Sequence, residues 1–198
     1  MNNTFWNDRY TMYNDVYGEA PNPFFKKFID SKKPGRILLP AEGEGRNAIY
    51  AASKGWEVDA FDFSDVAREK ALAKAAKKGV HIHYDLQDLV TFRAAKKYDA
   101  VGLIYVHLPE EQRKTFHNEV YESIESGGFL VLEAFAKQQI HYQSGGPKDP
   151  AMLYDAPSIC NDFPFLHVLS CGQKEIALEE GEFHKGKGFV IQLIGQKL

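Results

Sequence analysis

The sequence predicts an α/β protein with a doubly wound, mostly parallel sheet of seven strands. Short apolar runs alternate with segments whose apolar residues recur at helical spacing, and glycines follow several of these helical segments. The last two apolar runs are joined by a connection that is too short for a crossover helix. Because parallel neighbours need such a crossover, we expect the C-terminal strand pair to be antiparallel and the rest of the sheet to be parallel.

The first half of the chain contains three expected strands. Pro23, at a position where a helix tolerates proline, is followed by phenylalanines at helical spacing. Ser64 is a suitable N-cap for a helix in which alanines recur every four positions. The expected elements are, in order, a helix at 23–31, a strand at 37–39, a helix at 45–54, a strand at 57–62, a helix from Ser64 to about Lys78 and a strand near 80–84.

The second half of the chain contains the other four strands. Pro109 opens a helix in which Phe116, Val120 and Ile124 share one face. The pair Gly127–Gly128 is expected to stop that helix. The remaining elements are a strand at 98–105, a strand at 129–132, a loop at 143–150, a short helix near 155–162 and strands near 166–178 and 188–196.

Composition excludes several classes of protein. The 198 residues are 44% apolar and 26% charged, which is typical of one globular domain, and the formal charge of -3 provides no basic field for nucleic acid. The start lacks the pattern of a signal peptide, and no window is apolar enough to span a membrane. Cys160 and Cys171 lack metal-site spacing. We expect a single cytoplasmic domain over residues 1–198, a monomer or homodimer, without nucleic-acid or membrane partners.

A glycine turn and an acidic residue predict a nucleotide site. Gly43 and Gly45 lie between the first strand and the next helix, where small residues let a ligand approach the backbone. Asp62 ends the second strand, 17 positions after Gly45, where a carboxylate can accept hydrogen bonds from both ribose hydroxyls. Strand, turn, helix, strand and acid in this order predict a nucleotide site better than the glycines alone. The alternative is a tight turn and an ordinary surface aspartate.

The chain resembles the class I methyltransferases, which use S-adenosylmethionine, and especially their tellurite-resistance and thiopurine methyltransferase-like group. The resemblance covers nearly the whole chain. It rests on the segment 42–47, on Asp62, on Asp85-Leu86, on the segment 126–130 and on the closing antiparallel pair. It implies a Rossmann-like fold, S-adenosylmethionine as cofactor and an activity that transfers a methyl group to a small molecule, such as a thiol or a chalcogen oxyanion. Leu39 and Ala41 stand where family members often have an acidic residue and a glycine.

The resemblance also implies a role for particular residues. The glycine turn would pass under the methionine part of the cofactor, Asp62 would hold the ribose, and Asp85 and Leu86 would border the adenine. The segment 1–22 would fold over the cofactor as a lid, in which Arg9 pairs with the methionine carboxylate. The alternative is that the aromatic residues of this segment simply anchor the terminus. The expected cofactor contacts are Arg9, Ala41, Glu42, Gly43, Gly45, Arg46, Asp62, Phe63, Asp85, Leu86 and Tyr105.

Two histidines are candidates for the chemistry. Methyl transfer needs alignment and exclusion of water, and a base only if the nucleophile arrives protonated. His107 follows the fourth strand, at the edge where open α/β sheets bind ligands, and His184 lies in the final hairpin loop. The alternatives are a histidine that satisfies the next helix terminus and an exposed loop histidine, respectively. His81 and His83 lack a third ligand in a motif, so we expect no metal.

Two other functions stay open. An oxidoreductase that uses NAD or NADP would share the glycine turn, but it would normally need a second domain for its substrate. A regulatory protein that binds S-adenosylmethionine without catalysis would be compatible with the unusual Leu39 and Ala41.

Overall fold

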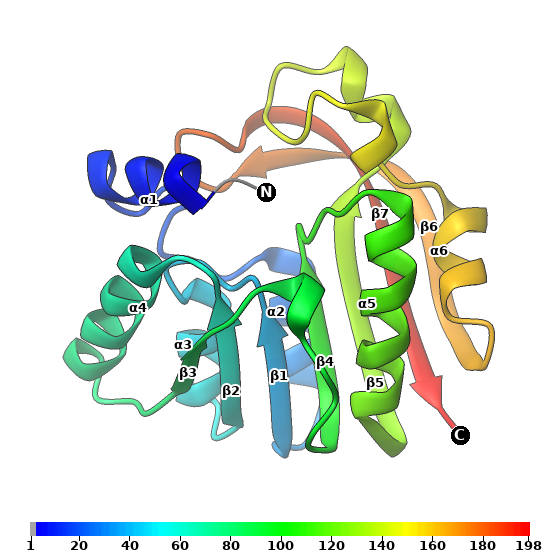
Figure 1. Cartoon of the computed structure of the whole chain (residues 1–198), viewed down its shortest axis with the longest axis horizontal. Coiled ribbons are helices and arrows are strands. Elements are labelled where there is room, and N and C mark those ends of the chain that lie inside the picture. The colour runs from blue at the N-terminus through cyan, green and yellow to red at the C-terminus, as the bar shows by residue number, and fades with distance from the viewer. Residues whose placement is uncertain (1–2) are drawn as a thin grey trace.

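The computed structural model describes residues 3–198 and contains a single sheet with helices on both faces (Figure 1). The strands lie in the order β3-β2-β1-β4-β5-β7-β6, and β7 runs antiparallel to both of its neighbours. The predicted fold class, a doubly wound and mostly parallel seven-stranded sheet, is therefore confirmed. The strands are β1 (Arg36–Pro40), β2 (Glu57–Asp62), β3 (His83–Leu86), β4 (Tyr98–Ile104), β5 (Ile124–Phe135), β6 (Leu166–Glu179) and β7 (Lys185–Lys197).

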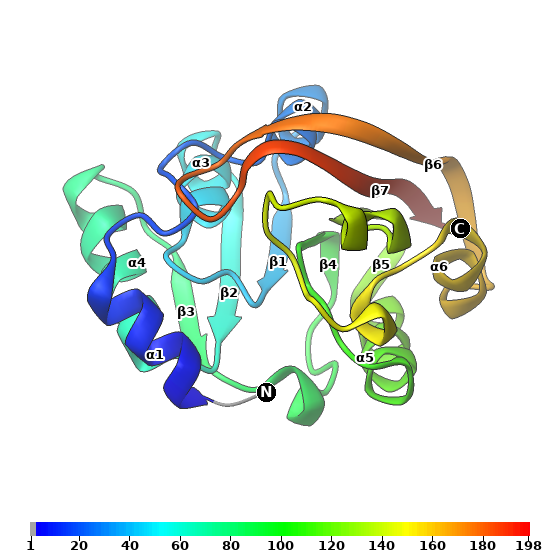
Figure 2. The ribbon, with the colours of Figure 1, turned by 90° about the horizontal axis from the view of Figure 1, so that it is seen from above.

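The helices cover the sheet in two layers, because successive strand residues face opposite sides. Leu38 packs with α5 and α6, whereas Ile37 and Leu39 pack with α2, α3 and α4. Figure 2 shows α2 and α3 on one side of the sheet and α5 and α6 on the other. The helices are α1 (Asn3–Met12), α2 (Pro23–Ser31), α3 (Arg46–Ser53), α4 (Asp65–Lys77), α5 (Glu110–Ser123) and α6 (Ala156–Asp162), with 3-10 turns η1 (Leu89–Thr91), η2 (Lys137–His141) and η3 (Pro150–Met152).

Helix α1 was not expected from the sequence, which predicted only an extension before the first helix. Apart from Met12, its residues are polar or aromatic and form no continuous apolar stripe, so the pattern gave no helical signal. The helix is stabilised by tertiary contacts: Tyr10 is buried against Ala67 of α4, and Trp6 packs against the same cluster. Residues 1 and 2 of the expected lid segment lie outside the described residues.

The glycine pair Gly127–Gly128 does not stop α5, contrary to the expectation. The helix ends at Ser123, and Ile124 already pairs with Tyr98 as the first residue of β5. The register of β5 against β4 shifts just after this pair. Gly127 lies at this irregularity and has a φ of +83°. A Cβ on Gly128 would lie 3.0 Å from the carbonyl oxygen of Tyr98. The glycines therefore serve a kinked strand entry and not a helix terminus.

A buried ion pair joins α5 to α6. Arg113 Nε lies 2.6 Å from Asp162 Oδ2, and His117 Nδ1 lies 2.9 Å from the same oxygen. All three side chains are at most 4% exposed. The two cysteines also come together near this helix, with the sulfur atoms of Cys160 and Cys171 3.7 Å apart as free thiols. Within residues 3–198, the helices are too short or too polar to cross a bilayer.

Candidate active site

The turn between β1 and α3 has an unusual backbone. Ala41, Gly43 and Gly45 all have positive φ values, of 50°, 60° and 84°. A Cβ on Gly45 would lie 2.8 Å from the Cβ of Ala71 in α4, and one on Gly43 would lie 2.6 Å from the hydroxyl of Tyr10. Glycine is thus required here by the left-handed backbone and by close packing. Ala41 adopts the same left-handed backbone conformation, although its Cβ makes that conformation strained.

Glu42 supports the turn from inside the protein. Its Oε1 accepts hydrogen bonds from the backbone N–H groups of Asn47 and Ala48, at 2.7 and 2.8 Å, so its carboxylate occupies the N-terminus of α3. Burial raises the pKa of Glu42 to about 7, although these hydrogen bonds act to lower it. Leu39, at the position where family members often have an acid, is buried in the core. Glu42 therefore holds the turn and the helix together, whether or not it also contacts a ligand.

Asp62 connects the end of β2 to the same turn. Its Oδ2 accepts a hydrogen bond from Gly43 N at 3.1 Å, and its Oδ1 accepts one from Ser64 N at 2.9 Å. The residue is 5% exposed, and burial raises its pKa to about 6. The alternative of an ordinary surface aspartate is therefore wrong. The buried hydroxyl of Tyr10 lies close to Gly43, so α1 covers this part of the turn.

The residues expected around the adenine separate into two groups. Leu86 is the β3 partner of Asp62 and is 58% exposed, and Phe63 follows Asp62 directly. Asp85 lies on the other side of β3, with its carboxylate 3.6 Å from His83 Nε2. The structure thus brings Phe63 and Leu86 to the strand end that carries Asp62 and directs Asp85 away from them.

Tyr105 continues from β4 at the centre of the sheet edge. Its φ of +55° is rare for a bulky side chain, and such strain is common at functional sites. The Tyr105 hydroxyl donates a hydrogen bond to Glu133 Oε1 at 2.9 Å, and its ring stacks on Phe135 with centroids 4.7 Å apart. The expected position of Tyr105 at the carboxyl edge of the sheet is therefore correct.

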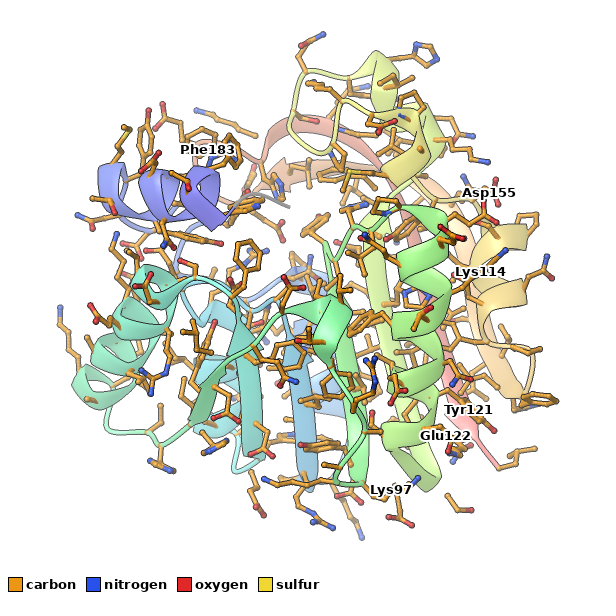
Figure 3. The ribbon with its side chains drawn as sticks, viewed as in Figure 1. Lys97, Lys114, Tyr121, Glu122, Asp155 and Phe183 are labelled. Carbon is orange, nitrogen blue, oxygen red and sulfur yellow. The ribbon has the colours of Figure 1, made fainter. Side chains whose placement is uncertain are left out.

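Arg9 projects from α1 into a group of aromatic rings. Its guanidinium carbon lies 4.6 Å from the ring centroid of Phe183, which is located in the β6–β7 loop beside α1 (Figure 3). The rings of Phe5 and Trp6 lie at 4.5 and 5.1 Å, and Tyr17 Oη is 3.5 Å away. Across residues 3–198, no carboxylate comes within 4 Å of Arg9, so this half-buried cation has aromatic neighbours and no ion-pair partner.

His107 has both ring nitrogens occupied by the backbone. Its Nδ1 lies 2.8 Å from the carbonyl oxygen of Met152, and its Nε2 accepts a hydrogen bond from Phe135 N at 3.2 Å. This pairing requires a neutral ring with the proton on Nδ1. Burial lowers the pKa of His107 to about 4. In this conformation His107 fixes the 137–153 segment onto the end of β5 and has no free lone pair.

His184 is not an exposed loop residue: only 5% of its surface is accessible. Its ring is enclosed by three aromatic side chains, and its Nδ1 lies 3.5 Å from Glu180 Oε2. The surrounding rings are Tyr17 at 4.4 Å, Tyr105 at 4.6 Å and Phe135 at 5.1 Å between centroids. The final hairpin therefore reaches back over the end of β4, where the sequence predicted the acceptor side of the site.

A buried polar network that the sequence analysis missed underlies this edge. Asn22, the N-cap of α2, donates from Nδ2 to Glu133 Oε1 at 2.6 Å and to Glu180 Oε1 at 2.9 Å. Arg46, which was predicted to contact the cofactor, has its Nη2 3.3 Å from Glu180 Oε2. Glu180 precedes His184 by four positions in one loop. This spacing was the sequence signal that could have indicated a role for Glu180. Nothing local in the sequence indicates the contribution of Asn22.

A separate cavity lies away from the glycine turn. It measures about 930 Å³ and is located between α2 and the strands β6 and β7. Glu133 and Glu180 reach it from the buried network, but no residue of the glycine turn lines it. Within residues 3–198, no three potential metal ligands among His, Cys, Asp and Glu converge.

Comparison with known proteins supports one class of enzyme. Residues 37–128 match the family model described as "Methyltransferase domain". The N-methyltransferase NodS from Bradyrhizobium japonicum WM9, solved with S-adenosyl-L-homocysteine, has a TM-score of 0.75 and 14% identity over 100% of this chain and 99% of its own. TehB from Haemophilus influenzae has a TM-score of 0.77 and 15% identity over 98% of this chain and 67% of its own. The fold is the Rossmann-like fold of these proteins, and the family match supports an S-adenosylmethionine-dependent methyltransferase.

Relatives in sequence point to the same class. A protein of Geobacillus sp. (strain WCH70) that bears the name of a methyltransferase is 25% identical over 171 residues, which cover 80% of this chain and 65% of that protein. The ribosomal RNA small subunit methyltransferase B of Thermus thermophilus is 29% identical over 87 residues, covering 42% of this chain and 22% of that enzyme. The chain thus spans less than two thirds of the length of either relative. The narrower tellurite-resistance and thiopurine methyltransferase-like group stays a prediction.

Proposed function

We propose that this chain binds S-adenosylmethionine and transfers its methyl group to a small nucleophile, such as a thiol or a chalcogen oxyanion. The observation that carries the proposal is the connection of the Asp62 carboxylate to the glycine turn, within a segment that matches a methyltransferase domain. Gly43 and Gly45 shape this turn with their left-handed backbone, and Tyr10 of the lid segment lies over Gly43. Asp62 supplies the acceptor that a ribose needs. When bound, the cofactor supplies a methyl group on a positively charged sulfur.

The lid segment 1–22 supports the methionine end of this site. Arg9 carries a positive charge without a carboxylate partner among the described residues, so it is available for the methionine carboxylate or for an anionic acceptor. Phe63 and Leu86 offer apolar surface for the adenine beside Asp62. In this proposal Ala41, Glu42, Arg46 and Tyr105 shape the site. Asp85 lies on the other side of β3 and would contribute only at its border.

The two histidines have different proposed roles. His184 lies at the acceptor side, enclosed by aromatic rings that would exclude water from a reacting nucleophile. His107 has a structural role, in which it holds the surrounding segments together, because both of its nitrogens bind their backbone groups. The chain is further proposed to be a single domain over residues 1–198, cytoplasmic, and a monomer or homodimer.

Another candidate function is a regulatory protein that binds the cofactor without catalysis. The observation that favours it is the replacement of the usual acid by the buried Leu39, together with the commitment of Glu42 to the helix N-terminus. Action on RNA is less favoured, because the formal charge of -3 provides no general attraction for a phosphate backbone.

A methyl-transfer assay separates these possibilities. The purified protein would be incubated with S-adenosylmethionine carrying a labelled methyl group and a panel of alkyl thiols, heteroaromatic thiols, selenite and tellurite. We expect labelled product from at least one acceptor, and a lower kcat/KM for that acceptor in His184→Gln, with cofactor affinity unchanged. Cofactor binding without turnover across the panel would favour the regulatory alternative, and wild-type kinetics in His184→Gln would remove His184 from the acceptor side.

A further inference from the structure

The β6–β7 loop is closed by a short-range contact between two buried polar residues. Glu180 N donates a hydrogen bond to His184 O at 2.9 Å, so the two residues face each other across the turn. Their side chains also face each other, with Glu180 Oε2 3.5 Å from His184 Nδ1. Both atoms are buried and neither makes a hydrogen bond within residues 3–198, although Arg46 Nη2 lies 3.3 Å from the same Glu180 oxygen. A small rotation would make the contact between Glu180 and His184 a hydrogen bond, and burial favours such a pairing because unpaired polar atoms are costly.

The orientation of the His184 ring is determined by its surroundings. Tyr17 precedes α2, Tyr105 follows β4 and Phe135 ends β5, so three separate segments pack against one imidazole. With Nδ1 directed at Glu180, the opposite nitrogen Nε2 faces the loop at Gly145, where a Cβ on that glycine would lie 3.4 Å from it. Within the described residues, no hydrogen bond engages Nε2, in contrast to both nitrogens of His107. His184 is therefore the histidine at this edge that retains a free lone pair.

Burial and the neighbouring charges favour an ionised Glu180 and a neutral His184. Burial opposes ionisation of Glu180, but His184 and Arg46 together lower its pKa to about 2. Asn22 adds a hydrogen bond to Glu180 Oε1. For His184, burial lowers the pKa, Glu180 opposes this shift, and Arg46 and Arg9 add to it. At neutral pH the carboxylate is charged, and the imidazole is neutral and ready to accept a proton.

We propose that Glu180 is a positioning residue for His184: it holds the proton on Nδ1, so that Nε2 is the base that takes the acceptor's proton. This inference rests on the proposed function and narrows the substrate to nucleophiles that arrive protonated, such as thiols. As the acceptor sulfur forms its bond to the methyl carbon, its S–H proton moves to Nε2, and the electron pair of the broken carbon–sulfur bond stays on the leaving sulfur. The imidazolium then lies beside the Glu180 carboxylate and later releases its proton to solvent.

Nitrogen NMR of the histidine rings tests the proposal without any acceptor or cofactor. Protein labelled with ¹⁵N in its imidazoles would be titrated with pH, and the His184 signals would be assigned from their loss in His184→Gln. In the wild type we expect the proton of His184 on Nδ1 and an unprotonated Nε2 at neutral pH. In Glu180→Gln we expect a loss of this tautomer preference and a His184 titration midpoint at lower pH, because a negative charge is removed. The charged groups that face the ring are Glu180, Arg46 and Arg9, and the neutral titratable groups that face it are Tyr17, Tyr105 and His107.

The matched control is Glu182→Gln, a carboxylate in the same loop, which should leave the His184 tautomer and midpoint unchanged. His107 serves as an internal reference for the native fold, since its proton should stay on Nδ1 in every variant. A wild-type His184 with its proton on Nε2 would overturn the proposal, as would a folded Glu180→Gln with an unchanged tautomer and midpoint. These outcomes are independent of cofactor binding, whose failure would instead contradict the proposed function.

Discussion

Asp62→Asn should weaken the binding of S-adenosylmethionine by about 2–4 kcal/mol, which corresponds to a factor of about 30 to 1000 in Kd. The ionised carboxylate offers acceptors to the ribose while it accepts hydrogen bonds from Gly43 N and Ser64 N. The amide keeps one acceptor oxygen and replaces the other with a donor, which faces either a backbone N–H or the ligand's hydroxyl. Both the ribose contacts and the shape of the glycine turn are therefore affected.

Calorimetric titration of wild type and variant gives this difference directly. The matched control is Asp59→Asn in the same strand, whose carboxylate pairs with Lys96 and Tyr98, and it should bind the cofactor as the wild type does. Because burial raises the pKa of Asp62 to about 6, wild-type affinity should also fall below about pH 6, and Asp62→Asn should lose this dependence. Unchanged affinity in a folded Asp62→Asn would show that Asp62 is not the ribose ligand.

The second large effect concerns stability. Asp162→Ala should lower the free energy of unfolding by about 3–5 kcal/mol, because Arg113 and His117 would remain buried without their shared carboxylate. For a chain of this length, the loss corresponds to a fall in Tm of about 6–20 °C. Thermal melts followed by circular dichroism measure it. Glu110→Gln, which breaks the exposed pair with Lys114 on the same helix, is the control and should change Tm little.

The same residue predicts a pH dependence of stability. Burial opposes ionisation of Asp162, but hydrogen bonds from His117 and Arg113 outweigh it and lower the pKa. A carboxyl whose pKa is lower in the folded state stabilises the fold above its unfolded value of about 3.9. This contribution is lost as the pH falls through the folded-state pKa. An Asp162→Ala protein with the Tm and acid sensitivity of the wild type would show that the buried pair is energetically neutral.

The sheet was predictable because each of its elements has a local signal. The helix after Ser64 has the expected cap, with Ser64 Oγ accepting from Ala67 N, and β2 begins and ends at the predicted residues. The short connection before β7 correctly predicted antiparallel pairing. Helix α1 lacked such a signal, because its stability depends on the contact between Tyr10 and α4. Gly127 and Gly128 were misread, because glycines serve a strand kink as well as a helix end.

The candidate site was predictable in its position but not in its hydrogen bonds. Chain order alone brings the glycine turn, Asp62 and Tyr105 to one edge of the sheet. The partners of His107 lie on residues 28 and 45 positions away, at Phe135 and Met152, and no local pattern indicates them. Burial of Glu42 and Asp62, which raises the pKa of both carboxyls, likewise depends on the packed structure.

Calorimetric titration of the unmodified protein with S-adenosylhomocysteine and, separately, with NAD tests the central claim most directly. S-Adenosylhomocysteine carries the same adenosine and amino-acid parts as the cofactor and lacks the transferable methyl group, so binding is measured without turnover. The account predicts saturable binding of one S-adenosylhomocysteine per chain and no saturable binding of NAD. Clear binding of NAD, with none of S-adenosylhomocysteine or S-adenosylmethionine, would contradict it and favour an oxidoreductase.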